Sequence, residues 1–289
     1  MTGVDGVVVV DKPPGMTSHD VIDVVRRRLR TKKVGHAGTL DPAATGVLVV
    51  GIGRATRLLD FSQQARKRYV AVARLGIVTS TLDASGEVLA TRSVHITRTD
   101  IERELRRFEG TIEQVPPMVS AVKVGGERLY RKALRGEEVA RPARRVTIYR
   151  LELTQFDHTD QAVRATVDVT CSAGTYIRTL VNDLGAALGC GAHLESLRRV
   201  EAGGFSLADA VPLDGIDEAS VRPPIDAVRQ LRSIDVNGAT AALVQNGRPI
   251  EAPVKVDENE PVALLRAGDL LAVYRGRAGR LVADRVIPR

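Results

Sequence analysis

GHAGTLDPAATGVLVVGIG, residues 35–53, joins a glycine-rich segment that holds one carboxylate, Asp41, to an apolar run at residues 47–52. The apolar run predicts a buried strand. Glycine adopts backbone conformations that other residues avoid, and the proline after Asp41 disfavours helix at that aspartate. We therefore expect an ordered loop with Asp41 at its apex, directly before a core strand. Spacing alone favours a simpler role, in which Asp41 caps a helix that begins at Pro42.

Outward from this loop, strands and helices are mixed without the regular strand–helix alternation of a parallel α/β sheet. Thr17 and Ser18 predict the start of a helix that continues to Leu29, and Thr99 with Glu102 resembles the capping box of a helix that ends near Phe108. We expect an α+β fold with a largely antiparallel sheet. The other expected strands are residues 6–10, 69–75, 119–124, 146–156 and 162–172, and the other expected helices are residues 55–64, 125–143 and 174–188.

The length of 289 residues predicts about two domains. Hydrophobic residues make up 44% of the chain and charged residues 27%, which is ordinary for a globular protein and argues against disorder, collagen and coiled coil. Prolines and polar residues occupy residues 222–235, and three short strands are expected after them, at residues 262–265, 270–274 and 281–286. We expect a larger domain at residues 1–225 and a small β-rich domain at residues 230–289.

Several classes of protein are excluded by the sequence. No apolar run approaches the length of a membrane span, and the N-terminus does not resemble a secretory signal, so we expect a cytoplasmic protein without a membrane partner. The two cysteines, Cys171 and Cys190, and the five scattered histidines show no zinc spacing, so we expect no metal. Dinucleotide-binding, P-loop and nucleophile-elbow motifs are also missing.

Basic residues are concentrated in two places. The chain carries 42 Lys and Arg against 35 Asp and Glu, a net charge of +7. Residues 26–33 hold six basic residues and no acid, and residues 123–150 hold nine basic and three acidic residues, a surplus of +6. A single run of charge is usually a solvated surface. Two separate basic clusters favour a polyanionic partner such as nucleic acid.

The residues 35–53 resemble the catalytic loop of the TruB family, the tRNA pseudouridine-55 synthases. Further similarities follow in the family's order across residues 5–200: VVDKPPG with TS at residues 9–18, KRY at 67–69, TSTLDASG at 79–86, PPMVSAVKVGGERLY at 116–130, GTYIRTL at 174–180 and HLESLRR at 193–199. This resemblance implies the pseudouridine synthase fold at residues 1–225, and the C-terminal module resembles a PUA RNA-binding domain.

The resemblance implies an isomerase that needs no cofactor. In the family, the N1–C1′ bond of a uridine in the tRNA T arm breaks and a C5–C1′ bond forms. Asp41 matches the essential aspartate, whose carboxylate acts as a nucleophile. Attack at uracil C6, attack at the sugar, and a route through an eliminated glycal all stay open. Arg178 matches the arginine that pairs with this aspartate. An opposite charge nearby favours the ionised form of a carboxylate.

The resemblance also implies which residues line the uridine pocket. Tyr69 matches the tyrosine that stacks on the flipped uracil and takes part in late proton transfer, whereas a tyrosine in a strand would otherwise be expected to pack in the core. Tyr176 is expected in the same pocket, and Leu197 is expected to form an apolar wall. The uridine must leave the folded T loop. His36 resembles the histidine that fills the vacated position, although a hydrogen-bonding role in the loop stays open.

The expected partner is tRNA, bound by a monomer that needs no protein partner. The basic insertion at about residues 123–145 is expected to close over the T arm. Residues expected to contact the RNA backbone are Lys12, Lys123, Arg128, Arg131, Lys132 and Arg141.

Three other functions stay open at this stage. The first is a guide-RNA-dependent synthase of the same family, which the small C-terminal region argues against. The second is a tRNA-folding chaperone without essential catalysis, which the intact Asp41, Tyr69 and Arg178 argue against. The third is a basic isomerase that acts on small molecules, whose binding would be insensitive to salt.

Overall fold

The computed structural model describes residues 4–118, 123–124, 127–128, 135, 139–159 and 161–287, with the backbone alone at residues 123–124 and 127–128. The described chain forms two compact units. The first unit contains Met1–Pro42, Gly46–Ala65 and Glu201–Arg289, and the second contains Ala43–Thr45 and Arg66–Val200. Each unit holds a predominantly antiparallel sheet with helices, so the expected α+β class is confirmed.

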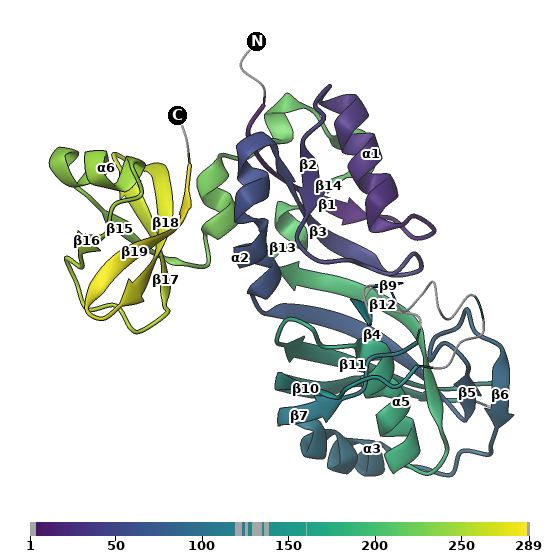
Figure 1. Ribbon diagram of the computed structural model, residues 1–289. Helices are drawn as coiled ribbons and strands as arrows, with labels where there is room; N and C mark the ends of the chain where they lie inside the picture. The colour runs from purple at the N-terminus through teal and green to yellow at the C-terminus, as the bar shows by residue number, and fades with distance from the viewer. Residues whose placement is uncertain are drawn as a thin grey trace. The chain divides into compact units, whose positions relative to one another are not determined.

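The first unit is built on β1 (Gly6–Lys12) and β3 (Thr45–Ile52), which pair antiparallel. Val8 and Val10 belong to the cluster that packs against α1 (Ser18–Arg28), while Val7 and Val9 belong to the cluster on the opposite face. Figure 1 shows α1, in purple, alongside β1 and β2. A strand that is covered on both faces reads as a continuous apolar run, which explains the four consecutive valines.

Short elements from residues 34–64 and 205–228 complete the part of this unit around β1 and β3. β2 (Val34–His36) pairs antiparallel with β3, and β14 (Val211–Pro212) pairs parallel with β1. The helix expected at residues 55–64 is split into a 3-10 helix and an α-helix. The other elements are η1 (Gly53–Leu58), α2 (Leu59–Gln64), β13 (Phe205–Ser206), η3 (Leu207–Asp209), η4 (Leu213–Gly215), η5 (Glu218–Ser220) and η6 (Pro224–Val228).

The C-terminal module contains a five-stranded sheet in the order β15-β17-β18-β19-β16. Leu264, Tyr274 and Val244 lie in its own core, whereas Ala263 and Val273 belong to the apolar cluster that contains β1 and α2. The three expected C-terminal strands are confirmed, and the PUA-like identity stays a prediction. The elements are β15 (Arg232–Asp235), α6 (Gly238–Gln245), β16 (Ile250–Glu251), β17 (Pro261–Arg266), β18 (Asp269–Arg277) and β19 (Arg280–Val286).

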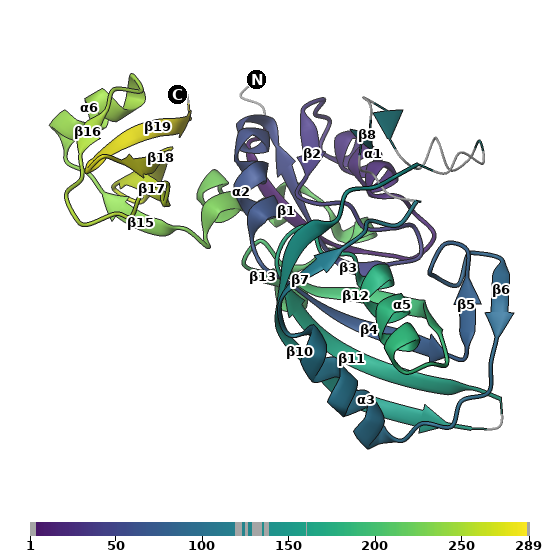
Figure 2. The ribbon, with the colours of Figure 1, turned by 60° about the horizontal axis from the view of Figure 1, so that its bottom comes forward.

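The second unit has a sheet in the order β12-β4-β11-β10-β7. Figure 2 shows α3 and α5 on one face of this sheet, and both helices contact it. The strand β12 has mixed polar and apolar residues and was not expected from the sequence. The elements are β4 (Lys67–Leu75), β5 (Ile77–Thr79), β6 (Val88–Thr91), α3 (Arg98–Leu105), η2 (Arg106–Phe108), β7 (Gly110–Gln114), β8 (Lys123–Val124), β9 (Glu127–Arg128), β10 (Arg144–His158), β11 (Val163–Cys171), α5 (Ile177–Ala187) and β12 (Ala192–Ala202).

Two sequence predictions change in this unit. The capping box of α3 is formed by Thr97 and Asp100, not by Thr99 and Glu102, so the helix begins at Arg98. The helix expected at residues 125–143 falls mostly outside the described residues, and the described part includes the short hairpin of β8 and β9.

Candidate active site

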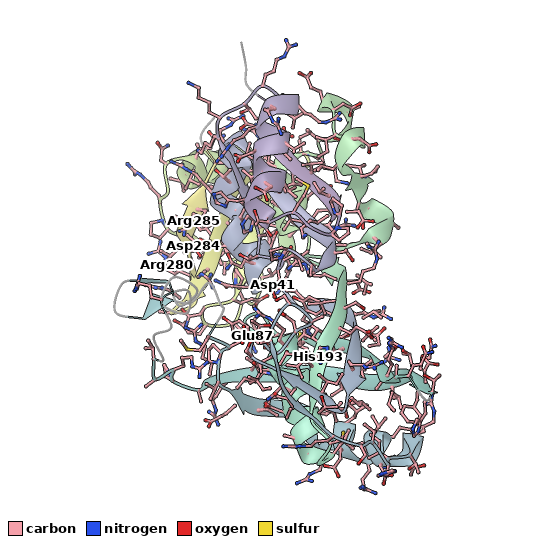
Figure 3. The ribbon with its side chains drawn as sticks, turned by 90° about the vertical axis from the view of Figure 1, so that its right-hand side faces the viewer. Asp41, Glu87, His193, Arg280, Asp284 and Arg285 are labelled. Atoms are coloured by element: carbon pink, nitrogen blue, oxygen red, sulfur yellow. The ribbon has the colours of Figure 1, made fainter. Side chains whose placement is uncertain are left out.

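Asp41 lies in the connection between β2 and β3, where the residues on either side of it are fixed. The hydroxyl of the buried Ser18 accepts from the backbone N–H of Leu40 at 2.9 Å and donates to the carbonyl of Leu40 at 3.1 Å. The carbonyl of Pro42 accepts from the N–H of Gly15 at 2.9 Å. Pro42 and Ala43 form a turn and no helix, so a helix-capping role for Asp41 is wrong. The half-buried Asp41, labelled in Figure 3, is presented by an anchored loop.

Lys12 forms a third anchor of this loop. Its side chain is fully buried, and its ammonium donates to the carbonyls of Pro13 at 2.9 Å, Met16 at 2.6 Å and Pro42 at 3.1 Å. An ammonium group has three protons to donate, and a buried charge is tolerated only where such partners exist. The prediction that Lys12 contacts the RNA backbone is therefore wrong, because its buried ammonium donates to backbone carbonyls of the turn before α1 and of the Asp41 loop.

His36 occupies β2, opposite Val50 of β3. Its half-buried ring lies 6.4 Å, centroid to centroid, from the ring of His19 on α1, in an edge-to-face arrangement. No local sequence pattern associates these two histidines, because the helix of His19 and the strand of His36 are separated by the basic segment at residues 26–33. Stacking of His36 in an RNA loop stays a prediction.

Tyr69 lies on β4, where odd-numbered residues face the interior. Its side chain is 7% exposed, and its backbone is in register with Val169 of β11. The preceding residue, Arg68, lies on the opposite face and forms an ion pair with Asp168 at 2.8 Å. Burial of the tyrosine agrees equally with core packing and with the base-stacking role, which stays a prediction.

Arg178 lies in the first turn of α5 and is 5% exposed. Its Nη1 donates to the carbonyl of Thr81 at 3.3 Å and lies 3.5 Å from Oδ2 of Asp83. The other oxygen of Asp83 accepts from the Thr81 hydroxyl at 2.6 Å and from the Ser85 N–H at 3.0 Å. The second unit thus holds a buried guanidinium against a carboxylate that is itself fixed by a turn.

Asp83 is the site residue that sequence reasoning missed. It lies within the stretch TSTLDASG, which appears in the sequence analysis only as a family similarity. The alternation of Thr81, Asp83 and Ser85 is a usable signal, because a carboxylate that accepts from the hydroxyl and backbone of its neighbours forms a rigid turn.

Tyr176 is the N-cap residue of α5, and its side chain provides no cap. The buried amide of Gln114, at the end of β7, fixes the backbone of this residue instead: its oxygen accepts from the Tyr176 N–H at 3.0 Å, and its nitrogen donates to the Tyr176 carbonyl at 3.3 Å. The side chain of Tyr176 is half-buried, as is that of Leu197 on β12. Their roles in lining the uridine pocket stay predictions.

Two buried cations lie near the start of β4. Lys67 is 6% exposed and Arg199 of β12 is 1% exposed. Burial, followed by the nearby charge of Arg199, lowers the pKa of Lys67 to about 8. Neither residue was singled out as a site residue from the sequence, because lysine and arginine are usually exposed.

The predicted RNA-backbone residues of the insertion are mostly beyond the described structure. Arg131 and Lys132 lie outside the described residues, as do the side chains of Lys123 and Arg128. The half-buried Arg141 donates to the carbonyl of Pro116 at 3.2 Å. The clamp expected at residues 123–145 therefore stays a prediction.

In the described part of the chain, no three histidine, cysteine or acidic side chains gather as a metal ion would require. None of its helices is both long and apolar enough to cross a membrane.

Two family sequence models match the chain. Residues 26–177, more than half of the chain, match the one described as "TruB family pseudouridylate synthase (N terminal domain)". Residues 178–234 match the one described as "tRNA pseudouridylate synthase B C-terminal domain".

Whole proteins and solved structures are similar over nearly the full length. A protein named tRNA pseudouridine synthase B from Symbiobacterium thermophilum is 51% identical over 247 residues, which are 84% of this chain and 82% of that protein. A protein of the same name from Thermobifida fusca is 46% identical over 283 residues, which are 95% of this chain and 96% of that protein. A crystal structure of a Cbf5-Nop10-Gar1 complex contains a chain that aligns with a TM-score of 0.77 at 27% identity, covering 98% of this chain and 85% of that one. The chain belongs to the TruB family of pseudouridylate synthases.

Proposed function

We propose that the protein converts uridine 55 in the T arm of tRNA to pseudouridine. The N1–C1′ bond breaks and a C5–C1′ bond forms, while a proton leaves C5 and N1 gains one, so the composition of the base is unchanged. The observation that supports this most directly is the anchoring of the Asp41 loop. Leu40 and Pro42 are both tied to buried groups, so the carboxylate between them is presented by fixed backbone.

Asp41 supplies the nucleophilic carboxylate in this proposal. Whether it acts at C6, at C1′ or through a glycal, it must be ionised when the substrate binds. Arg178 supplies the positive charge that favours this ionised form. Its guanidinium is already desolvated and held in place by Thr81 and Asp83, so little reorganisation is needed during the reaction.

The substrate must be extruded from the T loop, which costs a few kcal/mol. Tyr69 contributes stacking on the flipped uracil, worth roughly 1–3 kcal/mol. Tyr176 and Leu197 complete the apolar part of the pocket, and His36 fills the vacated position in the RNA loop. The half-buried state of these three side chains leaves part of each available to a ligand.

We also propose a monomeric enzyme that works without a protein or guide-RNA partner. The relatives named tRNA pseudouridine synthase B are 46–51% identical to this chain, whereas the chain in the Cbf5-Nop10-Gar1 complex is 27% identical. The greater similarity to the former supports a protein that acts on tRNA alone.

The test is to incubate the purified protein with an unmodified tRNA transcript, and separately with a bare T-arm stem-loop, and to map pseudouridine in both. The proposal predicts modification at position 55 in both RNAs without additives. Modification that requires added RNA or protein would point to guided activity. Accelerated tRNA folding without any modification would point to a chaperone.

A further inference from the structure

We propose that the exposed basic patch at the end of α1, formed by Arg27, Arg28, Arg30, Lys32 and Lys33, binds the phosphate backbone of the substrate tRNA. This α1 basic patch is distinct from the insertion at residues 123–145 and from the Asp41 loop. The inference rests on the proposed function and adds a second contact region to it. All five side chains are exposed.

The patch differs from the arginine-rich surface of α3 in its lack of ion pairs, although Asp11 and Asp214 line one pocket together with Arg28. No described acidic side chain forms an ion pair with any of its five members, and residues 24–40 contain no Asp or Glu. On α3, by contrast, the exposed Arg98 and Arg103 each pair with a carboxylate at 3.0 Å. Five unpaired like charges repel one another until an anion binds among them. The helix dipole accounts for basic residues in the last turn only, and three members lie beyond Leu29, where α1 ends.

The backbone conformation of Arg30 is the strongest indication that the patch has a function. It follows the C-cap Leu29 and has φ of +48°, in the left-handed region. The N–H of Thr31 donates to the carbonyl of Arg26 at 3.1 Å, and that of Arg30 to Arg27 at 3.4 Å, which is the Schellman arrangement. Glycine is the favoured residue at this position, since a Cβ there is strained. The sequence places an arginine where glycine would be more stable, and such strain is characteristic of functional sites.

The patch is also fixed relative to the loop that holds Asp41. At its near end, α1 is bonded to Leu40 through Ser18. The 11 residues of the helix span about 16 Å at 1.5 Å per residue. At the far end, the carbonyl of Lys33 accepts from the N–H of Gly53 at 2.8 Å, which secures the segment after the helix. The cations are thus held on the same anchored segment as the Asp41 loop, one helix length from Ser18.

The experiment measures tRNA affinity as a function of salt with the full-length protein and an unmodified tRNA transcript. Two variants are used: Arg30→Gly, and the triple variant Arg27→Gln, Arg30→Gln and Lys32→Gln. The matched control, called the α3 control, is Arg98→Gln, Arg103→Gln and Arg107→Gln, which removes the same charge from the ion-paired arginines of α3 and the adjoining η2. Each phosphate contact contributes roughly 0.7–0.9 to the slope of log affinity against log salt.

The triple variant should reduce that slope by about two and raise KM, with kcat at saturating tRNA unchanged. The α3 control should behave like the wild type. Arg30→Gly should reduce the slope by a little under one while its melting temperature stays equal to that of the wild type or rises, which a merely structural role for Arg30 would not produce.

An unchanged slope and affinity in the triple variant, or an equal loss in the α3 control, would overturn the proposal. If the wild-type protein formed no pseudouridine on the transcript, the proposed function would fail instead, and the binding slopes would still decide the role of the patch.

Discussion

The buried Arg178 forms an ion pair with the half-buried Asp83, with 3.5 Å between Asp83 Oδ2 and Arg178 Nη1, although the two belong to segments that are remote in sequence. Asp83 is the first residue after a left-handed turn at Leu82 and is held by Thr81 and Ser85. The position of the arginine is therefore set by two elements, the turn that holds Asp83 and the first turn of α5.

Replacing Asp83 with asparagine should lower kcat by about 10- to 100-fold, because the guanidinium loses the group that orients it and misplacement of a catalytic charge is costly. Single-turnover rates of pseudouridine formation measure the effect. The Glu195→Gln variant, which breaks the more exposed ion pair with Arg164, should keep the wild-type rate. Equal rates for Asp83→Asn and wild type would show that the pair does not position Arg178.

Replacing Lys12 with methionine should destabilise the protein by about 3 kcal/mol, because hydrogen bonds from a buried ammonium to several carbonyls are lost. The loop that carries Asp41 should loosen, so kcat should fall as well. Urea unfolding and pseudouridine formation are measured together. The Ser18→Ala variant removes the α1 hydroxyl that bonds Leu40 of the same loop, and it should lower the free energy of unfolding by about 1 kcal/mol. A Lys12→Met protein as stable as the wild type would contradict the anchoring role.

The pKa of Lys67, lowered to about 8 by burial and then by Arg199, predicts a pH dependence of stability. The lysine pKa is about 10.4 in the unfolded chain, so between pH 8 and 10.4 the unfolded state binds more protons than the folded state. The free energy of unfolding should therefore gain a contribution that rises with pH in this window, by roughly 3 kcal/mol at most.

The Lys67→Met variant should lack this contribution. The comparison is the free energy of unfolding in urea at pH 7 and pH 9.5, with Lys255→Met, at an exposed position, as the control that keeps it. An identical pH dependence in wild type and Lys67→Met would show that the lysine does not titrate in this range.

The helix α3 provides a direct comparison between sequence pattern and structure. Thr97 and Asp100 make both hydrogen bonds of the capping box. Thr97→Ala should reduce the free energy of unfolding by about 1 kcal/mol, and Thr99→Ala, at an exposed position two residues later, should have little effect. Thermal unfolding of the two variants distinguishes them, and a larger effect at Thr99 would favour the original assignment from the sequence.

Local sequence patterns predicted the parts of the fold that local physics decides. Four consecutive valines in β1 indicated a strand, which the structure buries on both faces, and Thr17 indicated the start of α1. The strand β12 was missed because its residues AHLESLRRVEA do not alternate between polar and apolar. Its pairing partners in the sheet decide its conformation, and they are distant in the sequence.

The candidate site shows the same division. The glycines and proline around Asp41 indicated an ordered loop with Asp41 at its apex, but nothing local indicated that three carbonyls converge on the ammonium of Lys12. Lysine is seldom fully buried, so a surface role was the natural expectation. The partnership of Asp83 with Arg178 depends on how two elements of the second unit pack, which a linear pattern does not contain.

The most direct test of the central claim replaces Asp41 with asparagine, which keeps the size of the side chain and removes its negative charge. Because the reaction exchanges the hydrogen on C5, release of tritium from tRNA that carries 5-tritiated uridine measures turnover, and filter binding measures affinity. We predict no tritium release above background with tRNA affinity nearly unchanged. An Asp41→Asn protein that releases tritium at the wild-type rate would contradict the account.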